Sequence, residues 1–175
     1  PRERRFEVSE RIGSRGEVIT ALADTEIDRV ITDIAGAKVD GVAICLLFSF
    51  LSPEHEQRVA TAIRKALPDV FVSASSEVQP ELREFERMST TVLNGYLQPR
   101  LARYMDRLGA AIGKMAPNAA IGINQSSGGL MSIERAARFP VRTALSGPAA
   151  GVVGAAHAAR LSGKPVTFLV ALAAV

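Results

Sequence analysis

The hydrophobic positions in the first half of the chain follow helix spacing and then strand spacing. Ile27, Val30 and Ile34 recur at intervals of three and four residues, which predicts one buried helix face, and Gly36 weakens the end of this helix. Residues 42–50 (VAICLLFSF) are apolar at both the odd and the even positions, which face opposite sides of a strand. A strand in a parallel sheet is buried on both faces, so this run predicts the central strand.

A second helix and a second strand follow this run. Ser52 supplies a capping hydroxyl, Pro53 fits the first helical position and Glu54 makes the first turn acidic, which predicts a helix that ends at Leu67. Residues 70–74 then alternate between apolar and more exposed positions, as in a less central strand. Together these elements predict a β-α-β unit.

The rest of the chain continues this alternation of helices and strands. Residues 1–17 are charged with mixed sign, which predicts a solvated edge that can include a short strand. Residues 82–115 predict a long helix, with a kink or break near residues 94–98 because Pro99 lacks an N–H and its ring clashes with an earlier carbonyl. Such an order indicates an α/β fold, a layered mixed β-sheet with crossover helices. The further predicted elements are strands at 119–124, 141–145 and 166–175 and helices at 133–139 and 147–161.

The composition is that of one or two small soluble domains. The 175 residues are 47% hydrophobic and 22% charged, and the net charge of +3 comes without a dense basic face, so no nucleic-acid partner is expected. The longest apolar runs are about ten residues, well short of the roughly twenty that span a bilayer. A single cysteine, Cys45, excludes a disulfide framework and a multi-cysteine zinc site and favours a cytoplasmic protein. Because the chain starts at Pro1 without a signal peptide, we expect it to be a piece of something longer.

Few side chains suggest acid–base or metal chemistry. His55 lies in the first turn of a predicted helix, where a surface position is expected, and His157 lies in an alanine-rich helix, where a packed or half-exposed position is expected. Neither suggests a metal site, and no catalytic residue is assigned. The motifs G-x-S-x-G, H-E-x-x-H and G-x-x-x-x-G-K-[ST] are missing from the sequence, so simple hydrolase and P-loop functions lose support.

An alternating charged segment precedes the long helical stretch. Arg83, Glu84, Glu86 and Arg87 are spaced to form pairs at i,i+3 and i,i+4, which predicts a solvated helix surface.

Two segments combine glycine with the end of a helix or strand. In residues 146–151 (SGPAAG), the serine is expected to cap a helix, Pro148 fits its first turn, and the glycines allow another backbone or a ligand to approach. Helix N-termini attract anions because their first N–H groups lack internal partners. A close helix-to-sheet contact would also require small residues here, so both interpretations stay open. The loop at residues 126–129 either wraps a phosphate or turns a corner.

Three blocks of sequence resemble one known family. They read CLLFSFLSPEHEQRV, SSEVQPELREFERMSTTVLNGYLQPRL and QSSGGLMSIERAARFPVRTALSGPAAGVVGAAHAA. In this order they resemble the A subunit of the hydantoinase/oxoprolinase family, the group of hydantoin utilization protein A and N-methylhydantoinase A. The resemblance implies part of an actin/Hsp70/acetate-kinase-like (ribonuclease H-like) fold. It also implies that ATP activates a carbonyl, for hydrolysis of a small cyclic amide or carboxylation of a ketone, beside a B subunit.

One feature of that family is missing. Its two phosphate loops, of the kind D-x-G-G-T-x-T-D, do not occur in this sequence. Residues 165–168 resemble the strand that leads into the second loop, yet residues 169–175 (LVALAAV) follow directly. Either the sequence of the family stops at this point and an unrelated tail follows, or the second phosphate loop is deleted from it. Without the aspartates of these loops we expect ATP and Mg²⁺ to act in the parent subunit, and the isolated chain to bind neither and to hydrolyse no ATP.

These observations predict the middle portion of an ATP-dependent cyclic-amide hydrolase subunit. Residues 1–80 are assigned to the end of an N-terminal domain, residues 81–118 to a helical connector and residues 119–175 to the start of the core domain. From the resemblance and from the chemistry of helix N-termini, we predict which residues form part of the nucleotide cleft. They either donate backbone N–H groups to the nucleotide or allow it to approach the backbone closely. These residues are Asn124, Ser126, Gly128, Gly129, Ser146, Gly147, Pro148 and Gly151.

Two alternatives stay open. One is a subunit similar to the beta subunit of an ATP-dependent ketone carboxylase. The other is a non-catalytic interaction module whose residues 82–115 dock a partner helix or a second copy, as in a homo-oligomer. Three roles stay open for a set of polar residues in the second block that resembles the family. These roles are contact with the substrate, with the nucleotide cleft or with the B subunit. The set comprises Arg83, Glu84, Arg87, Thr90, Thr91 and Asn94.

Overall fold

The structure, a computed structural model, describes residues 4–165 and consists of two compact units. Unit 1 comprises residues 1–99 and unit 2 residues 100–175. Unit 1 contains β1 (Arg11–Ile12), β2 (Val18–Thr20), α1 (Asp24–Ala37), β3 (Gly41–Ile44), α2 (Glu54–Ala66), β4 (Phe71–Ala74) and α3 (Ser75–Val78). Helix α4 (Glu84–Met115) runs from unit 1 into unit 2. Unit 2 continues with β5 (Ile123–Asn124), β6 (Leu130–Met131), α5 (Ile133–Arg138), the 3-10 helix η2 (Pro140–Thr143) and α6 (Ser146–Ser162).

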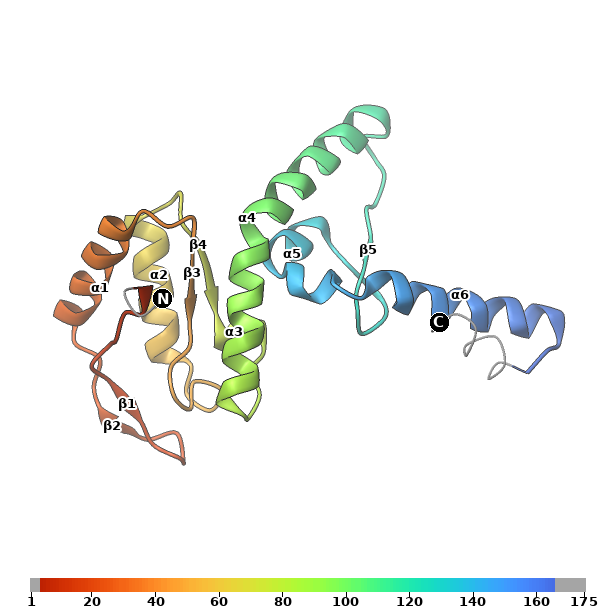
Figure 1. Cartoon of the computed structure of the whole chain (residues 1–175). Coiled ribbons are helices and arrows are strands. Elements are labelled where there is room, and N and C mark those ends of the chain that lie inside the picture. Colours follow the sequence, from red (N-terminus) through yellow and green to blue (C-terminus); the bar gives the residue numbers. More distant parts are fainter. Residues whose placement is uncertain (1–3, 166–175) are drawn as a thin grey trace. The chain divides into compact units, whose positions relative to one another are not determined.

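Unit 1 is built on the predicted β-α-β unit. Strands β3 and β4 pair in parallel, from Gly41 opposite Phe71 to Ile44 opposite Ala74, and α2 connects them. Helices α1 and α2 cover one face of this pair and the first part of α4 covers the other (Figure 1). The main apolar core of unit 1 lies on the α1–α2 side, and its buried members include Ile27, Val30, Ile34, Ile44, Val59, Ile63 and Val72. The predicted helix face of α1 is therefore confirmed.

The other face of the strand pair is formed by small residues. A Cβ atom at Gly41 would lie 3.2 Å from the carbonyl oxygen of Gly95 on α4. A Cβ atom at Gly95 would lie 3.7 Å from the hydroxyl of Ser73 and 3.9 Å from Cβ of Ala43. Small residues on both sides therefore bring the backbone of α4 close to the sheet.

The predicted central strand at residues 42–50 is wrong in its second half. Strand β3 ends at Ile44, residues 47–51 form turns, and Phe48 has a φ of 56°. The partner strand β4 ends at Ala74, after which α3 begins, so a longer β3 has no ladder to join. Cys45 is half-buried as a result, and within the described residues β3 pairs with β4 alone.

Several predicted boundaries also change. Helix α2 begins at Glu54 with Pro53 at its cap position, and the hydroxyl of Ser52 donates to Glu54 Oε2 (2.6 Å) instead of capping backbone N–H groups. Helix α4 continues through Pro99, so the helix is not broken there and the predicted kink is the alternative that remains. Residues 141–145 form no strand, because Pro140 opens the 3-10 turn η2 at this point. The predicted strand at 119–124 is reduced to β5, and the one predicted at 166–175 lies outside the described residues.

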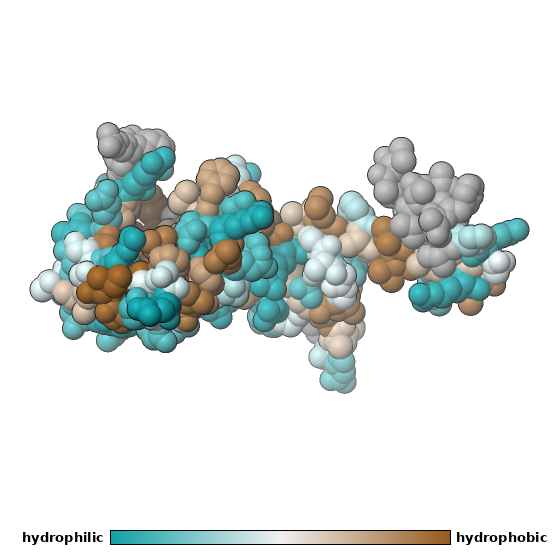
Figure 2. Space-filling view, turned by 90° about the horizontal axis from the view of Figure 1, so that it is seen from below, coloured by the Kyte–Doolittle hydropathy of each residue, from teal (hydrophilic) through white to brown (hydrophobic). Residues whose placement is uncertain are grey.

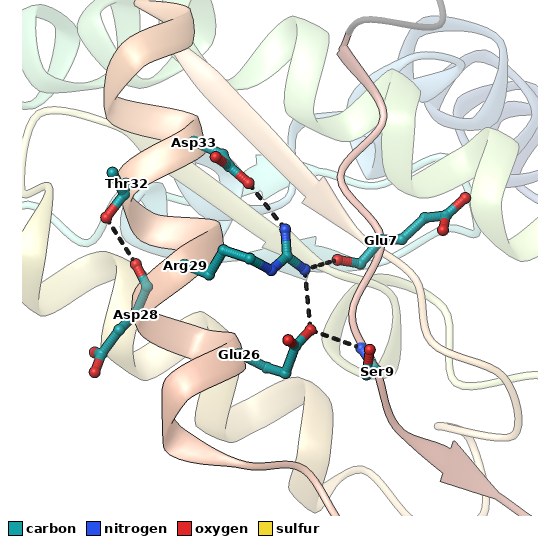
Figure 3. Close-up of polar contacts among 7 residues, drawn as sticks. All are labelled: Glu7, Ser9, Glu26, Asp28, Arg29, Thr32 and Asp33. Atoms are coloured by element: carbon teal, nitrogen blue, oxygen red, sulfur yellow. Dashed lines mark hydrogen bonds and ion pairs between the residues drawn. The ribbon is translucent and has the colours of Figure 1, made fainter.

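An arginine on α1 holds the N-terminal segment in place (Figure 3). Arg29 Nη2 donates to the carbonyl oxygen of Glu7 (2.7 Å) and to Glu26 Oε2 (2.9 Å), while Nη1 donates to Asp33 Oδ2 (2.9 Å). Glu26 Oε2 also accepts the backbone N–H of Ser9 (3.1 Å). The hydrogen bond from Arg29, followed by that from Ser9, lowers the pKa of Glu26 from 4.5 to about 2.

This shift gives unit 1 an acid-sensitive contact. Because the folded pKa of Glu26 lies below the unfolded value of 4.5, its stabilising contribution is present above that pH and is lost as the pH falls toward about 2. We expect Glu26→Gln to lower the melting temperature at pH 7 and to reduce its fall on acidification. Circular dichroism melts across this pH range measure both effects. Asp28→Asn, a change at an exposed carboxyl on the same helix, is the control. Equal acid dependence in Glu26→Gln and the wild type would contradict the assignment.

The surface of unit 1 contains an unusual apolar stripe on α4. The exposed fraction of Phe85 is 73%, of Val92 53% and of Tyr96 70%. Hydrophobic residues interrupt the hydrophilic surface in several places in the view of Figure 2. Among the helices of residues 4–165, none is long and apolar enough to cross a bilayer.

Candidate functional site

A pocket of about 450 Å³ lies in unit 2 between the β5–β6 hairpin and α6. The hairpin turn contains Gly128 (φ 86°) and Gly129 (φ 78°), a backbone region that glycine enters without steric cost. Two backbone bonds close the turn, from Gln125 N to the Gly129 carbonyl (3.0 Å) and from Gly128 N to the Gln125 carbonyl (3.1 Å). The lining combines two amide side chains with small and apolar groups: Asn124, Gln125, Gly128, Gly129, Leu130, Ala149, Ala150, Val153 and Gly154.

The structure brings together part of the predicted cleft. Asn124, Gly128 and Gly129 line the pocket, as do Ala149, Ala150, Val153 and Gly154 of α6. Ser126 does not line it but joins its two walls, because its backbone N–H donates to the Arg142 carbonyl (2.7 Å) and its hydroxyl accepts the N–H of Leu145 (2.9 Å). The other predicted residues, Ser146, Gly147, Pro148 and Gly151, lie on α6 outside the pocket lining.

The N-terminus of α6 differs from the prediction in its cap. Leu145 occupies the cap position, Ser146 is the first helical residue, and the cap position makes no side-chain hydrogen bond. The hydroxyl of Ser126 accepts the N–H of Leu145, the residue at the cap position, and not an N–H of the first helical turn. Pro148 lies in the first turn as predicted. Within the described residues, Cβ atoms at Gly147, Gly151 and Gly154 would meet nothing within 4 Å, so packing there gives no reason for small residues.

A buried carboxyl group organises unit 1. Glu56 on α2 is completely buried. Its Oε1 accepts the N–H of Leu46 (2.7 Å) and the hydroxyl of Ser75 (2.6 Å), and its Oε2 accepts the N–H of Ser76 (2.8 Å). The hydroxyl of Ser75 lies 3.1 Å from that of Ser49. Glu56 therefore joins the segment after β3 to the segment after β4, at the carboxyl ends of two parallel strands.

A buried arginine holds the same segment from the other side. Arg87 on α4 is completely buried, which overturns its predicted place on a solvated face. Its Nη2 donates to the Leu46 carbonyl (2.8 Å), its Nη1 donates to the Glu81 carbonyl (3.2 Å), and its guanidinium lies 5.3 Å from the ring centre of Phe50. Arg83 and Glu86 are exposed and form the predicted i,i+3 pair (3.6 Å).

Further along α4, the buried face is also polar. Thr91 donates to the Arg87 carbonyl (2.7 Å), Asn94 donates to the Ser73 hydroxyl (2.9 Å), and that hydroxyl donates to Gln98 (3.0 Å). Thr91, Asn94 and Gln98 are buried. Of the set of polar residues whose role was left open, Arg87, Thr91 and Asn94 are therefore buried inside unit 1.

The two histidines also differ from the prediction. His55 is buried, and its Nδ1 lies 2.6 Å from Oε2 of Glu10, which anchors the chain before β1 to α2. The surface position predicted for it is wrong because Glu10, 45 residues earlier, covers it. His157 is exposed instead of packed or half-exposed. Within residues 4–165 no three His, Cys, Asp or Glu side chains form a group that can hold a metal ion.

A sequence signal for Glu56 and Arg87 exists. Glu56 lies three and seven residues before Val59 and Ile63, so it shares their buried helix face. Arg87 shares a face with Thr91 and, one further turn on, Asn94. A charged residue at such a position indicates a buried polar contact instead of a solvated surface.

Two exposed carboxyls have pKa values below the usual range. The hydroxyl of Ser52 lowers the pKa of Glu54, and that of Ser132 lowers the pKa of Glu134. Ser132 also caps α5, since its hydroxyl accepts the N–H of Arg135 (3.3 Å). Both carboxyls lie in the first turn of a helix, where negative charge is favourable.

Comparison with known proteins gives consistent matches along the chain. The family described as hydantoinase/oxoprolinase matches residues 87–169, and the hydantoinase/oxoprolinase N-terminal region matches residues 1–67. The caprolactamase subunit alpha of Pseudomonas jessenii is 39% identical over 130 residues, 74% of this chain and 19% of that protein. The 5-oxoprolinase of Saccharomyces cerevisiae is 29% identical over 146 residues, 81% of this chain and 11% of that protein.

Two solved structures share the fold. The ATP-dependent caprolactamase from Pseudomonas jessenii superposes with a TM-score of 0.79 at 33% identity, covering 93% of this chain and 24% of that one. Nucleotide-free acetone carboxylase superposes with a TM-score of 0.76 at 26% identity, covering 89% and 22%. The chain thus spans a quarter or less of the length of these relatives. The two solved structures show that the chain has an actin-like α/β fold. Because the family and its N-terminal region match most of its residues in the same order, the chain belongs to the hydantoinase/oxoprolinase family.

Proposed function

We propose that this chain is part of a subunit that uses ATP to activate the carbonyl of a cyclic amide for ring-opening hydrolysis, and that the unit 2 pocket holds part of the nucleotide. The pocket is the observation that carries this proposal. It brings Asn124, Gly128 and Gly129 beside α6, as expected of a nucleotide cleft in this family. The similarity to an ATP-dependent caprolactamase and to a 5-oxoprolinase supports the reaction class.

The pocket residues fit a nucleotide in size and chemistry. Within the described residues, a Cβ at Gly128, Gly129 or Gly154 would enter open space, so these glycines leave room for a ligand. The side chains of Asn124 and Gln125 offer both donors and acceptors, while Val153 offers an apolar contact. In this arrangement the chain would position the ligand by hydrogen bonding and close backbone approach.

The chemistry itself comes from ATP. When bound, ATP supplies a phosphoryl group to the carbonyl oxygen of the amide, which turns a poor electrophile into one with a phosphate leaving group. Asn124 and the turn of Gly128 and Gly129 would orient the nucleotide. We assign no Mg²⁺ ligand to residues 4–165, because they hold no suitable group of carboxylates.

The relatives also support the proposed setting of the chain. Some are named as subunits, such as caprolactamase subunit alpha and the acetone carboxylase beta subunit, so we propose a B-type partner subunit in the cytoplasm. We further propose that residues 1–80 end an N-terminal domain, residues 81–118 form a connector and residues 119–175 begin the core domain. A hydantoin utilization protein A is the specific parent we propose.

The reaction is tested with the complete subunit that includes this chain, together with its partner. We expect cyclic amides such as caprolactam, 5-oxoproline or hydantoin to stimulate ATP cleavage, with one ADP formed for each ring opened. Stimulation by ketones with bicarbonate instead would favour the carboxylase alternative, for which the similarity to acetone carboxylase is the supporting observation. ATP cleavage that responds to neither substrate class would contradict the proposal.

The pocket is tested by filling it. Gly154 lines the pocket, and within the described residues a Cβ there meets nothing within 4 Å, so the first side-chain carbon of Gly154→Leu displaces no neighbour. Leucine has the higher helix propensity, so we expect stability to rise by about 0.5–1 kcal/mol. The ATP affinity of the complete subunit, measured by isothermal titration calorimetry, is expected to fall. Gly113→Leu, at an exposed helical glycine away from the pocket, is the matched control. Unchanged ATP affinity in a stabilised Gly154→Leu variant would show that the nucleotide binds outside this pocket.

A further inference from the structure

The apolar stripe on α4 occupies one side of the first half of this helix. Its members are spaced at i, i+3, i+7, i+8 and i+11, which places them on one face. They are Phe85, Met88, Val92, Leu93 and Tyr96. Met88 is 46% exposed and Leu93 is 45% exposed, and the other three are exposed further. Only Tyr96 carries a polar group, so contact of this side of the helix with water is unfavourable.

The stripe has the size of an interaction site. A Phe or Tyr side chain has roughly 150–250 Å² of surface, so Phe85 and Tyr96, at 73% and 70% exposure, leave roughly 200–350 Å² in water. Met88, Val92 and Leu93 extend this surface along the helix. Single exposed hydrophobic residues need no explanation, whereas a contiguous apolar patch of several hundred Å² marks a surface that binds another one.

Unit 1 already holds the opposite side of α4. Arg87 and Asn94 are completely buried there, and Arg87 donates to the carbonyl of Leu46 (2.8 Å). The backbone is also close, since a Cβ at Gly41 would lie 3.2 Å from the carbonyl oxygen of Gly95. Rotation of α4 to bury the stripe against the strand pair would break these contacts. The strand pair of unit 1 therefore does not cover the stripe.

Sequence similarity groups α4 with a different region from the strands on which it packs. The N-terminal region of the family matches residues 1–67, whereas the match to the hydantoinase/oxoprolinase family itself begins at Arg87, within α4. The first half of α4 nevertheless packs on the strand pair of unit 1. This helix thus has its inner side in the N-terminal part, while its sequence belongs to the part that follows.

Most of the polypeptide of each relative lies outside the part that this chain matches. The matched part is 19% of caprolactamase subunit alpha and 11% of the 5-oxoprolinase of Saccharomyces cerevisiae. The first relative is named as a subunit and the second is not, so a long further stretch of the same polypeptide is what the two share. A charge-free apolar surface is typical of a permanent interface, and a segment of the same polypeptide is always present to form one.

We propose that the apolar stripe is an interface within one polypeptide, covered in the complete subunit by an apolar face of the core region beyond residue 169. This inference rests on the proposed function, in which residues 119–175 begin the core domain of a longer subunit. The stripe then joins the N-terminal part to the core region by a contact additional to the continuous helix α4. The covering face is apolar opposite Val92 and offers a hydrogen-bond partner to the hydroxyl of Tyr96.

The experiment measures the accessibility of a cysteine placed in the stripe. Val92→Cys is a small change at an exposed position, and peptide mass spectrometry distinguishes residue 92 from Cys45. Alkylation rates are measured in this chain and in the complete subunit without its partner, each relative to the rate in urea. We expect nearly the unfolded rate in this chain. In the complete subunit we expect a rate at least about tenfold lower, because residue 92 then reacts only through local opening.

Two further variants make this result specific. Phe85→Cys, at one end of the stripe, is expected to show the same protection in the complete subunit. Gln57→Cys is the control, because Gln57 is exposed on α2, which covers the other face of the strand pair, and is expected to react rapidly in both proteins. Circular dichroism melts show whether each variant is folded.

Other occupants of the stripe would give different results. Protection that appears only when the partner subunit is added would overturn the inference, as would protection only at concentrations at which this chain dimerises in sedimentation velocity. Slow reaction in the monomeric chain, rapid reaction in the complete subunit, or equal protection of Gln57→Cys would also overturn it.

The inference and the proposed function fail separately. ATP cleavage stimulated by cyclic amides is measured on the same complete subunit with its partner. Protection of residue 92 without such cleavage would support the interface and contradict the proposed function. Stimulated cleavage with an accessible residue 92 would overturn the interface and leave the proposed function standing.

Discussion

Replacing Glu56 by alanine is expected to lower the free energy of unfolding by about 3–5 kcal/mol, because it leaves buried hydrogen-bond donors without an acceptor. The carboxyl accepts hydrogen bonds from Leu46, Ser75 and Ser76. In the variant the two backbone donors lose their partner, whereas the hydroxyl of Ser75 still has that of Ser49 at 3.1 Å. Each buried donor left unpaired costs about 1–3 kcal/mol. Relief of the desolvated carboxyl offsets part of this cost. Urea unfolding of the chain, followed by circular dichroism, measures the change.

Two variants make this result specific. Gln57→Ala removes an exposed polar side chain from the next position of α2 and is expected to change stability by less than about 0.5 kcal/mol. Glu56→Gln keeps one acceptor oxygen and is expected to fall between the wild type and Glu56→Ala. A loss below about 1 kcal/mol for Glu56→Ala would show that water replaces the carboxyl, and so that the site is more open than its complete burial indicates.

Replacing Arg87 by alanine is expected to lower the free energy of unfolding by about 2–4 kcal/mol, through lost packing and two unpaired carbonyl groups. The carbonyls of Leu46 and Glu81 lose their donor, and Phe50 loses the cation beside its ring. Arg87→Lys is expected to recover less than half of the loss, because an ammonium group lacks the planar fork that serves two carbonyls at once. The same urea titration measures both variants.

The control for Arg87 lies one turn earlier on the chain. Arg83 forms an exposed ion pair with Glu86, and Arg83→Ala is expected to cost less than about 1 kcal/mol because solvent screens such pairs. If Arg87→Ala and Arg83→Ala cost the same, the buried contacts of Arg87 contribute nothing net to stability. Full rescue by Arg87→Lys would point to charge alone instead of the two-carbonyl geometry.

The β-α-β unit was predictable from sequence because its signals are local. The spacing of Ile27, Val30 and Ile34 indicates α1, and the alternation at residues 70–74 indicates β4. The end of β3 was not predictable in the same way. Residues 45–50 are as apolar as the strand before them, and the strand ends because β4 offers no further partner. Strand length is thus a property of the pair, whereas apolar patterning is a property of one segment.

Helix α4 shows a second limit of pattern analysis. Apolar residues usually mark the buried face of a helix, yet the structure exposes Phe85, Val92 and Tyr96 and buries Arg87 and Asn94. Polar side chains can pack inside when each finds a partner, and the partners here are backbone carbonyls and the hydroxyl of Ser73. Such pairs join residues far apart in sequence, so a periodicity within one helix does not reveal them.

The candidate site was predictable in part for the same reason. Asn124, Gly128 and Gly129 share a short hairpin, and their turn chemistry is local. The start of α6 was mispredicted because the helix begins at Ser146, with Leu145 at its cap position, and the N–H of Leu145 is bound by the hydroxyl of Ser126.

The two bonds to Leu46 have a mechanical consequence for unit 1. Its N–H is held by Glu56 from α2 and its carbonyl by Arg87 from α4, so a single peptide segment is clamped by helices on opposite faces of the strand pair. Neither helix can slide along the sheet without pulling on the segment after β3. The two layers are therefore coupled through a loop, and a force applied to the first turns of α4 would be transmitted to α2 through this loop.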